Sequence, residues 1–170
     1  HSLGELSALV AAGALEYAAA LRLVRRRGEL MKAAGEENPG GMAAILGLDI
    51  KEVEKATVEA CVNGEIVEVA NDNCPGQVVI SGHSEAVERA MKAAKEFGAK
   101  RALPLAVSIA AHSHLMGSAQ KQFTEAISEA KLIDPLVPVV GNVSAEAMMT
   151  AEEIRDDLQG QLTSRVRWTE

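Results

Sequence analysis

The sequence predicts an α/β protein in which a compact βαββαβ unit interrupts a larger α/β domain. This prediction rests on the order of strand-like and helical segments between residues 41 and 106, and on the α/β character of the flanking segments. Strand, helix, strand, strand, helix and strand form the split βαβ, or ferredoxin-like, arrangement. We therefore expect a first part of the large domain over 1–40, an inserted ferredoxin-like subdomain over 41–106, and a second, truncated part of the large domain over 107–170.

The first region is predicted to be helical. Residues 4–12 are helix formers that stop at Gly13, a residue suited to the left-handed conformation that closes a helix. A second helix is expected over 16–34. The stretch 36–41 contains Pro and Gly and breaks the helical pattern, as a linker does.

The inserted region alternates strand and helix patterns. Helical periodicity runs over 50–62 and 84–97. The Asn, Pro and Gly residues of 71–76 indicate a turn between two strands. The strands themselves are expected at 42–46, 65–70, 77–80 and 101–107.

The last region returns to the larger domain. Ser113 or a neighbour is expected to cap a helix whose apolar positions continue to Ala130. Residues 137–140 form a continuous apolar run that is typical of a buried strand in a parallel sheet. Thr150 and Glu153 form a capping box that opens one more helix.

Composition argues against several classes of protein. A formal net charge of −7 disfavours nucleic-acid binding, which depends on Lys and Arg neutralising phosphates. No run of about 18 apolar residues predicts a transmembrane helix, and no basic-then-apolar leader suggests export. Cys61 and Cys74 are too few for a disulfide framework and lack metal-ligand spacing. We expect a cytoplasmic protein with no membrane partner.

Ser2 is the first candidate for chemistry. The run His1-Ser2-Leu3-Gly4 before a helix matches the second half of a nucleophile elbow, in which a serine sits on a tight strand-to-helix turn. In that geometry the backbone N–H of Leu3 would be one oxyanion donor. A Ser-x-Gly before a helix is also a common N-cap, so the motif alone leaves both interpretations open.

Arg27 is the second candidate, because the helical pattern places it on an apolar face. Its neighbours three and four residues away are Leu23, Val24, Leu30 and Met31. A buried cation needs an anionic partner. The partner can be a carboxylate of the protein, the side chain can extend out to water, or the carboxylate can belong to a substrate, which a planar guanidinium binds bidentately.

A histidine is needed as a base for a serine nucleophile. His112 follows the last strand of the inserted unit, and loops at strand ends commonly carry catalytic groups. His1, His83 and His114 are less well placed by their positions in the sequence. The residues alone leave a structural role for His112 equally open.

These segments together resemble the malonyl-CoA:acyl carrier protein transacylase family and the related acyltransferase domains of polyketide synthases. The resemblance covers essentially the whole chain. It implies an α/β-hydrolase-like large domain with the ferredoxin-like insertion, Ser2 as nucleophile, His112 as its base and Arg27 as the group that binds the malonyl carboxylate. Asn71 and Asn73 match family asparagines beside the substrate cleft. The matching segments are HSLGE, ALRLVRRRGELM, GGMAAILGL, NDNCPGQVVISG, KRALPLAVS, AHSHLM and VPVVGNV.

The resemblance also implies a reaction. A malonyl group passes from malonyl-CoA to Ser2 and then to the phosphopantetheine thiol of acyl carrier protein, in fatty acid biosynthesis and without a metal or other cofactor. The full-length protein is expected to be a monomer. The alternatives are an acyltransferase domain of a polyketide synthase and a serine hydrolase that cleaves esters or thioesters with water.

Some family features are expected to lie outside this chain, which reads as an internal fragment or a processed protein. They are the N-terminal glutamine-containing loop that supplies oxyanion contacts and the C-terminal segment whose backbone carbonyl orients the catalytic histidine. We therefore expect the 170-residue chain alone to have little or no transacylase activity. Malonyl transfer measured with the purified chain would contradict this. Arg165 stands where the family often has proline.

Overall fold

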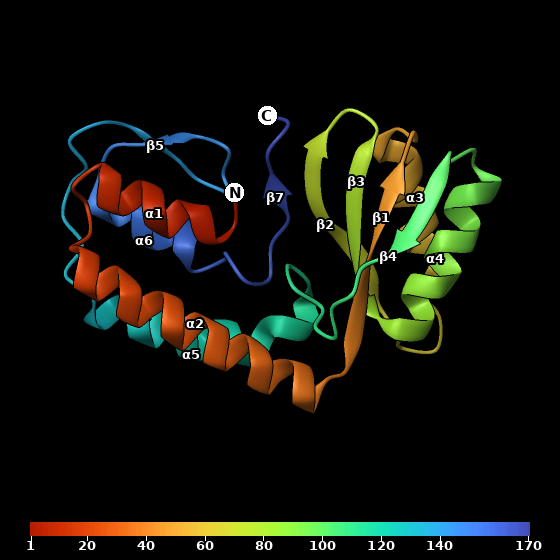
Figure 1. The fold of residues 1–170 in the computed structure, drawn as a ribbon, viewed down its shortest axis with the longest axis horizontal. Coiled ribbons are helices and arrows are strands. Elements are labelled where there is room, and N and C mark those ends of the chain that lie inside the picture. The colour runs from red at the N-terminus through yellow and green to blue at the C-terminus, as the bar shows by residue number, and fades with distance from the viewer.

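The computed structural model describes all 170 residues as a mixed α/β fold, with a lobe of helices beside a lobe built on a five-stranded sheet (Figure 1). No helix is both long enough and apolar enough to span a membrane. The helices are α1 (Leu3–Ala11), α2 (Tyr17–Glu37), α3 (Ile50–Ala60), α4 (Ser84–Glu96), the 3-10 helix η1 (His114–Met116), α5 (Gly117–Glu129) and α6 (Ala151–Leu158). The strands are β1 (Gly40–Leu46), β2 (Val67–Cys74), β3 (Gln77–His83), β4 (Arg101–Pro104), β5 (Val139–Val140), β6 (Ala147–Met148) and β7 (Val166–Arg167).

The central sheet has the strand order β4-β1-β3-β2-β7. Its first four strands are antiparallel neighbours, and the elements from β1 to β4 follow one another as strand, helix, strand, strand, helix, strand, as the sequence predicted. Helices α3 and α4 pack on this sheet around a buried apolar cluster of their own. The fifth strand, β7, comes from the C-terminal part of the chain and pairs in parallel with β2, so the sheet also joins the two lobes.

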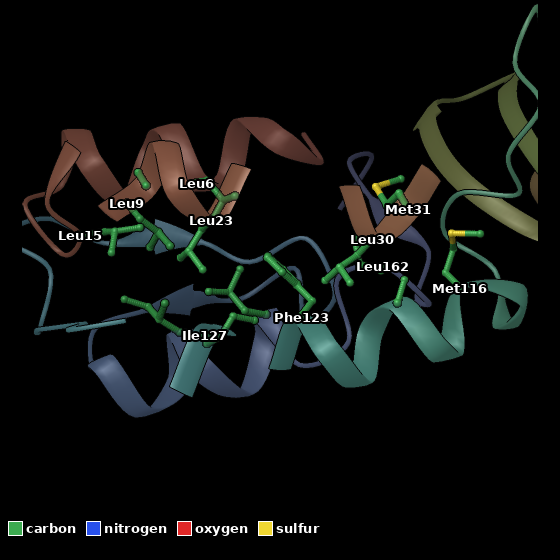
Figure 2. Close-up of a cluster of buried hydrophobic side chains, with 14 of the residues drawn as sticks. Leu6, Leu9, Leu15, Leu23, Leu30, Met31, Met116, Phe123, Ile127 and Leu162 are labelled. Atoms are coloured by element: carbon green, nitrogen blue, oxygen red, sulfur yellow. The ribbon is translucent and has the colours of Figure 1, made fainter. Parts of the chain in front are cut away.

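The helical lobe has a separate core, which Figure 2 shows. Leu6 and Leu9 of α1 face Phe123 and Ile127 of α5, and all four side chains are almost fully buried. Helix α2 crosses this core with the apolar face that the sequence predicted. Because Arg27 lies on that same face, the guanidinium is carried into the interior between the helices.

The turn predicted over 71–76 is wrong in extent. Strand β2 continues to Cys74, with register shifts between Val69 and Asn71 and again before Cys74, and the turn is reduced to Pro75 and Gly76. The backbone of Asn71 pairs with β3 on one side and with β7 on the other. Pairing on both sides overrides the local turn preference of an asparagine.

The buried parallel strand predicted over 137–140 is also wrong. Only Val139 and Val140 form a strand, and it pairs antiparallel with β6. Val139 is buried but Val140 is 63 % exposed, because this two-stranded ribbon contacts the helical core on one face only. The linker predicted over 36–41 is shorter than expected, since α2 continues to Glu37 and β1 begins at Gly40.

Candidate active site

Ser2 lies at the N-terminus of α1 in a strained backbone conformation. Its φ of 51° and ψ of −117° fall outside the regions that non-glycine residues ordinarily occupy. The backbone N–H of Ser2 donates to Asn142 Oδ1 at 2.7 Å, which helps to hold this geometry. The backbone N–H of Leu3, the first residue of α1, has no acceptor within the helix and is available to a ligand.

The His112 ring joins Ser2 to two backbone carbonyls. Ser2 Oγ lies 2.9 Å from His112 Nε2, and His112 Nδ1 lies 2.9 Å from the Gln161 oxygen and 3.2 Å from the Ser164 oxygen. Carbonyl oxygens only accept hydrogen bonds, so Nδ1 carries the proton of the neutral ring and Nε2 is left as an acceptor. The Ser2 hydroxyl can therefore donate to Nε2, as a nucleophile does to its base.

The surroundings of His112 favour the neutral ring. Its side chain is 5 % exposed, and burial is the main reason that the pKa of the imidazole falls to about 4. The positive charge of Arg27 lowers this pKa further, while the bonds to the two carbonyls raise it to a smaller extent. The ring is thus unprotonated at neutral pH and ready to accept a proton.

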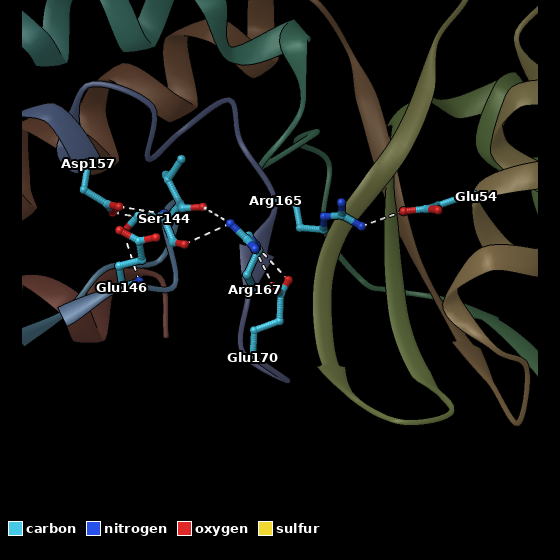
Figure 3. Close-up of polar contacts among 8 residues, drawn as sticks. Glu54, Ser144, Glu146, Asp157, Arg165, Arg167 and Glu170 are labelled. Atoms are coloured by element: carbon cyan, nitrogen blue, oxygen red, sulfur yellow. Dashed lines mark hydrogen bonds and ion pairs between the residues drawn. The ribbon is translucent and has the colours of Figure 1, made fainter.

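The prediction that the carbonyl orienting this histidine lies outside the chain is wrong. The segment that follows α6 turns back toward the site and presents the oxygens of Gln161 and Ser164 to His112. Arg165, which follows them, pairs with Glu54 of α3 at 2.7 Å, and Arg167 donates to the Ser144 oxygen at 2.9 Å (Figure 3). These contacts tie the C-terminal segment to both lobes.

Arg27 points at the serine and not at a carboxylate. Its Nη2 donates to Ser2 Oγ at 2.8 Å and its Nε donates to Gln161 Oε1 at 3.0 Å. The side chain is 7 % exposed and forms no direct ion pair within the chain, which excludes both a direct protein salt bridge and extension into water in this structure. Burial lowers the pKa of the guanidinium, and the charge of Glu5 opposes that effect.

Two further side chains complete the polar cluster. Gln161 Nε2 donates to Glu5 Oε2 at 2.6 Å, and the Asn142 N–H donates to Glu5 Oε1 at 3.4 Å. Burial raises the pKa of the Glu5 carboxyl to about 7. Sequence reasoning missed Glu5, because only two of its neighbours at helical spacing, Ala8 and Leu9, are apolar, whereas all four such neighbours of Arg27 are.

The two asparagines named from the sequence have different surroundings. Asn73 Oδ1 accepts a hydrogen bond from His1 Nε2 at 2.8 Å, which places it beside the residue that precedes Ser2. Asn71 is buried within β2 and its side chain makes no hydrogen bond in the chain. The structure thus brings Ser2, His112 and Arg27 together through hydrogen bonds and Asn73 to the edge of that group through His1, whereas the Asn71 side chain forms no hydrogen bond with the group.

No metal-binding cluster lies beside this group, but a hollow between the lobes opens onto it. No three His, Cys, Asp or Glu side chains lie together in a metal-binding arrangement, and Cys61 and Cys74 are free and exposed. A hollow of about 660 Å³ between the lobes reaches His112. A larger one of about 930 Å³ lies between α2 and α5, and none of Ser2, Arg27 and His112 lines it.

Comparisons with known proteins show the family to which the chain belongs. Residues 1–167 match the family model described as the acyl transferase domain. The malonyl CoA-acyl carrier protein transacylase of Escherichia coli K12 is 49 % identical over 169 residues, which is 99 % of this chain and 54 % of that protein. The chain therefore spans about half the length of the curated relatives it matches.

Solved structures give the same result. The malonyl CoA-acyl carrier protein transacylase of Coxiella burnetii superposes with a TM-score of 0.95 at 43 % identity, covering 99 % of this chain and 53 % of that one. A malonyl-transacylase in complex with its type II PKS acyl-carrier protein also superposes with a TM-score of 0.95, at 48 % identity, covering 99 % of this chain and 54 % of that one.

Proposed function

The chain belongs to the acyl transferase domain family, and we propose that the protein it forms part of is an [acyl-carrier-protein] S-malonyltransferase of fatty acid biosynthesis. The observation that carries the proposal is the placing of two groups around one oxygen. His112 Nε2 and Arg27 Nη2 lie 2.9 and 2.8 Å from Ser2 Oγ. A base and a carboxylate-binding cation at one serine suit an acyl group that bears a free carboxylate.

The first half-reaction loads the serine. The Ser2 hydroxyl gives its proton to His112 Nε2 while Oγ attacks the thioester carbonyl of malonyl-CoA. The Leu3 N–H is one donor to the resulting oxyanion. The carbon–sulfur bond then breaks, the coenzyme A sulfur takes the proton from His112, and a malonyl ester remains on Ser2.

The second half-reaction reverses these roles. The phosphopantetheine thiol of the acyl carrier protein gives its proton to His112 and attacks the ester carbonyl. Collapse of the intermediate breaks the bond to Ser2 Oγ, which takes back the proton, and malonyl-carrier protein leaves. The Gln161 and Ser164 carbonyls stabilise the protonated ring through Nδ1–H in both halves. The nucleophile, the base with its orienting carbonyls, and one oxyanion donor all come from this chain.

Arg27 would select the acyl group. The guanidinium uses Nε and one Nη2 hydrogen within the chain, which leaves N–H groups to bind the malonyl carboxylate. A neutral acyl group would leave this buried charge without an anion, and the site would reject it for that reason. Asn73, held beside Ser2 by His1, and Asn71 are proposed to line the path of the substrate.

We also propose the finer division of the fold. The strand order β4-β1-β3-β2, with α3 and α4 packed on the sheet, supports a ferredoxin-like subdomain over 41–106. The strained serine before α1 supports an α/β-hydrolase-like large domain formed by 1–40 and 107–170. A cytoplasmic location and a monomeric full-length protein stay predictions from the sequence.

Mass spectrometry of the full-length protein mixed with malonyl-CoA tests the proposal. We expect a malonyl adduct on Ser2 that persists until acyl carrier protein is added and is then transferred to it. An adduct that water removes as fast as it forms would instead support the hydrolase. The similarity to a malonyl-transacylase of a type II PKS acyl-carrier protein makes a polyketide carrier the second candidate acceptor, and the two carriers can be compared in the same assay.

The pH dependence of loading should follow His112. Because burial and Arg27 lower the pKa of its ring to about 4, the base stays active well below the ordinary histidine pKa of 6.5. We expect kcat/KM for malonyl-CoA to change little between about pH 7.5 and pH 5.5, and to fall about tenfold per unit only near and below about pH 4. Stopped-flow loading rates measure this profile. An ascending limb centred near pH 6.5 would contradict it.

A further inference from the structure

A buried chain of polar groups lies beneath the Ser2 hydroxyl and ends at one carboxyl group. Arg27 Nε donates to Gln161 Oε1 at 3.0 Å, and Gln161 Nε2 donates to Glu5 Oε2 at 2.6 Å. The three side chains are 7 %, 1 % and 2 % exposed, in that order. The proposed reaction uses Arg27 and the backbone oxygen of Gln161, but it gives no task to Glu5 or to the Gln161 amide.

The acceptor oxygen of Glu5 determines which way the Gln161 amide faces. As observed, the amide NH₂ group meets an acceptor on Glu5 and the amide oxygen meets a donor on Arg27. A rotation of 180° would set the amide oxygen against the Glu5 oxygen that now accepts from it, and the amide NH₂ group against a guanidinium. Arg27 and Glu5 would then each lose a buried hydrogen bond, which is costly away from water. Glu5 therefore keeps the acceptor atom of Gln161 directed at Arg27.

Acylation of Ser2 makes the hydrogen bond between Gln161 and Arg27 more important. Arg27 has two hydrogen-bond partners within the chain, Ser2 Oγ and the Gln161 amide. Once Ser2 is acylated, its oxygen becomes an ester oxygen and a poorer acceptor. The Gln161 amide is then the remaining protein group that orients the guanidinium. Without it, a long side chain with several rotatable bonds would have to be ordered by the substrate alone.

Glu5 is also connected to the Ser2 backbone, through Asn142. Its Oε1 accepts from the Asn142 N–H at 3.4 Å, and Asn142 Oδ1 accepts from the Ser2 N–H at 2.7 Å. The charged groups that face Glu5 are Arg27 from α2 and Asp157 from α6. Glu5 is thus joined by hydrogen bonds both to the amide that holds Arg27 and to the residue that holds the Ser2 backbone.

We propose that Glu5 is a positioning residue for acyl selection, which acts through the Gln161 amide to hold the Arg27 guanidinium where it receives the carboxylate of the acyl group. The inference rests on the proposed function and deepens it, because it says what keeps the selecting group in place. Glu5 itself contacts neither substrate nor reacting atoms. Its removal should therefore change the choice between acyl groups more than the reactivity of Ser2.

The test compares loading of Ser2 by malonyl-CoA and by acetyl-CoA in the full-length protein. Glu5→Met and Gln161→Met each remove one partner of the hydrogen bond between the Gln161 amide and the Glu5 carboxyl group. Gln161→Met keeps the backbone oxygen that contacts His112. We expect each to lower the ratio of kcat/KM for malonyl-CoA over acetyl-CoA by about tenfold, the effect of losing one buried hydrogen bond to a charged group. The double variant should lower this ratio no further than either single variant does, because both substitutions break the same hydrogen-bonded connection to Arg27.

Two matched variants complete the design. Glu5→Gln restores an acceptor oxygen of the same size, so it should recover most of the ratio that Glu5→Met loses. Glu59→Gln makes the same chemical change at an exposed residue of α3 and should leave the ratio unchanged. An unchanged ratio in folded Glu5→Met or in Gln161→Met would overturn the inference. Equal losses for both acyl groups, with no recovery in Glu5→Gln, would also overturn it and assign Glu5 a purely structural role.

Failure of the proposed function gives a different result. If the unaltered full-length protein forms no malonyl adduct on Ser2, the transferase assignment is wrong whatever the variants do. If it forms the adduct and prefers malonyl over acetyl, but keeps that preference in Glu5→Met and Gln161→Met, only the role of Glu5 is wrong.

Discussion

Replacing Ser2 with alanine in the full-length protein is expected to abolish covalent loading by malonyl-CoA and to lower transfer by at least about 10⁴-fold. Losses of this size follow the removal of a nucleophile from a serine enzyme, because binding and oxyanion contacts alone support only residual turnover. The structure adds a reason. Both His112 and Arg27 contact Ser2 Oγ. Without that oxygen, His112 has no hydroxyl to deprotonate and Arg27 loses one of its two hydrogen-bond partners.

Intact-protein mass spectrometry and steady-state transfer rates measure this effect. Ser7→Ala is the matched control, since Ser7 lies on the exposed side of the same helix and should leave loading unchanged. The Ser2→Ala variant should remain folded, because the substitution removes one oxygen from a half-buried residue. A malonyl adduct that forms on Ser2→Ala at an undiminished rate would place the nucleophile elsewhere.

Replacing Arg27 with alanine is expected to weaken malonyl loading far more than loading of a neutral acyl group. We expect kcat/KM for malonyl-CoA to fall about 100-fold or more, since truncating one member of a buried, hydrogen-bonded charge pair costs about 2–5 kcal/mol. Loading by acetyl-CoA should change little or improve, because its neutral acyl group does not need to pair with a buried cation. Rates measured with both thioesters on one preparation give the ratio directly.

Arg22→Ala is the matched control for Arg27, because Arg22 lies exposed on the same helix. It should leave the malonyl-to-acetyl ratio as it is in the unaltered protein. A parallel fall for both thioesters in Arg27→Ala would show that Arg27 supports the structure of the site and does not select the acyl group. The ratio is therefore more informative than either rate alone.

The helices and the order of strands could be predicted because they follow from local patterns. The apolar stripe of α2, the Gly13 that ends the first helical segment with a φ of +74°, and the capping box of Thr150 and Glu153 are all confirmed. Two of the errors about strands share one cause. The end of β2 and the short strand β5 depend on which strands pair with them, and the partners β7 and β6 follow only later in the chain.

The site residues also fall into those that local sequence patterns predicted and those that they did not. Ser2 at a helix start and Arg27 on an apolar face were visible in the spacing of residues, and the position of His112 after a strand made it a candidate. The resemblance to a family then linked the three. Glu5 has fewer apolar neighbours at helical spacing than Arg27 and was not selected, whereas Asn142 and Gln161 carry no pattern of their own.

By itself, then, the sequence determined the order of the elements, the position of Arg27 on an apolar helix face and the place of Ser2 before a helix. These are consequences of side-chain spacing over a few turns of backbone. Only the tertiary structure decided that His112 Nε2 lies 2.9 Å from Ser2 Oγ, and that Gln161 serves His112 with its backbone oxygen and Arg27 with its side chain. Hydrogen bonds between residues far apart in the sequence depend on how separate elements are placed against one another. Apolar periodicity marks which face of an element is buried, but not which partner covers it.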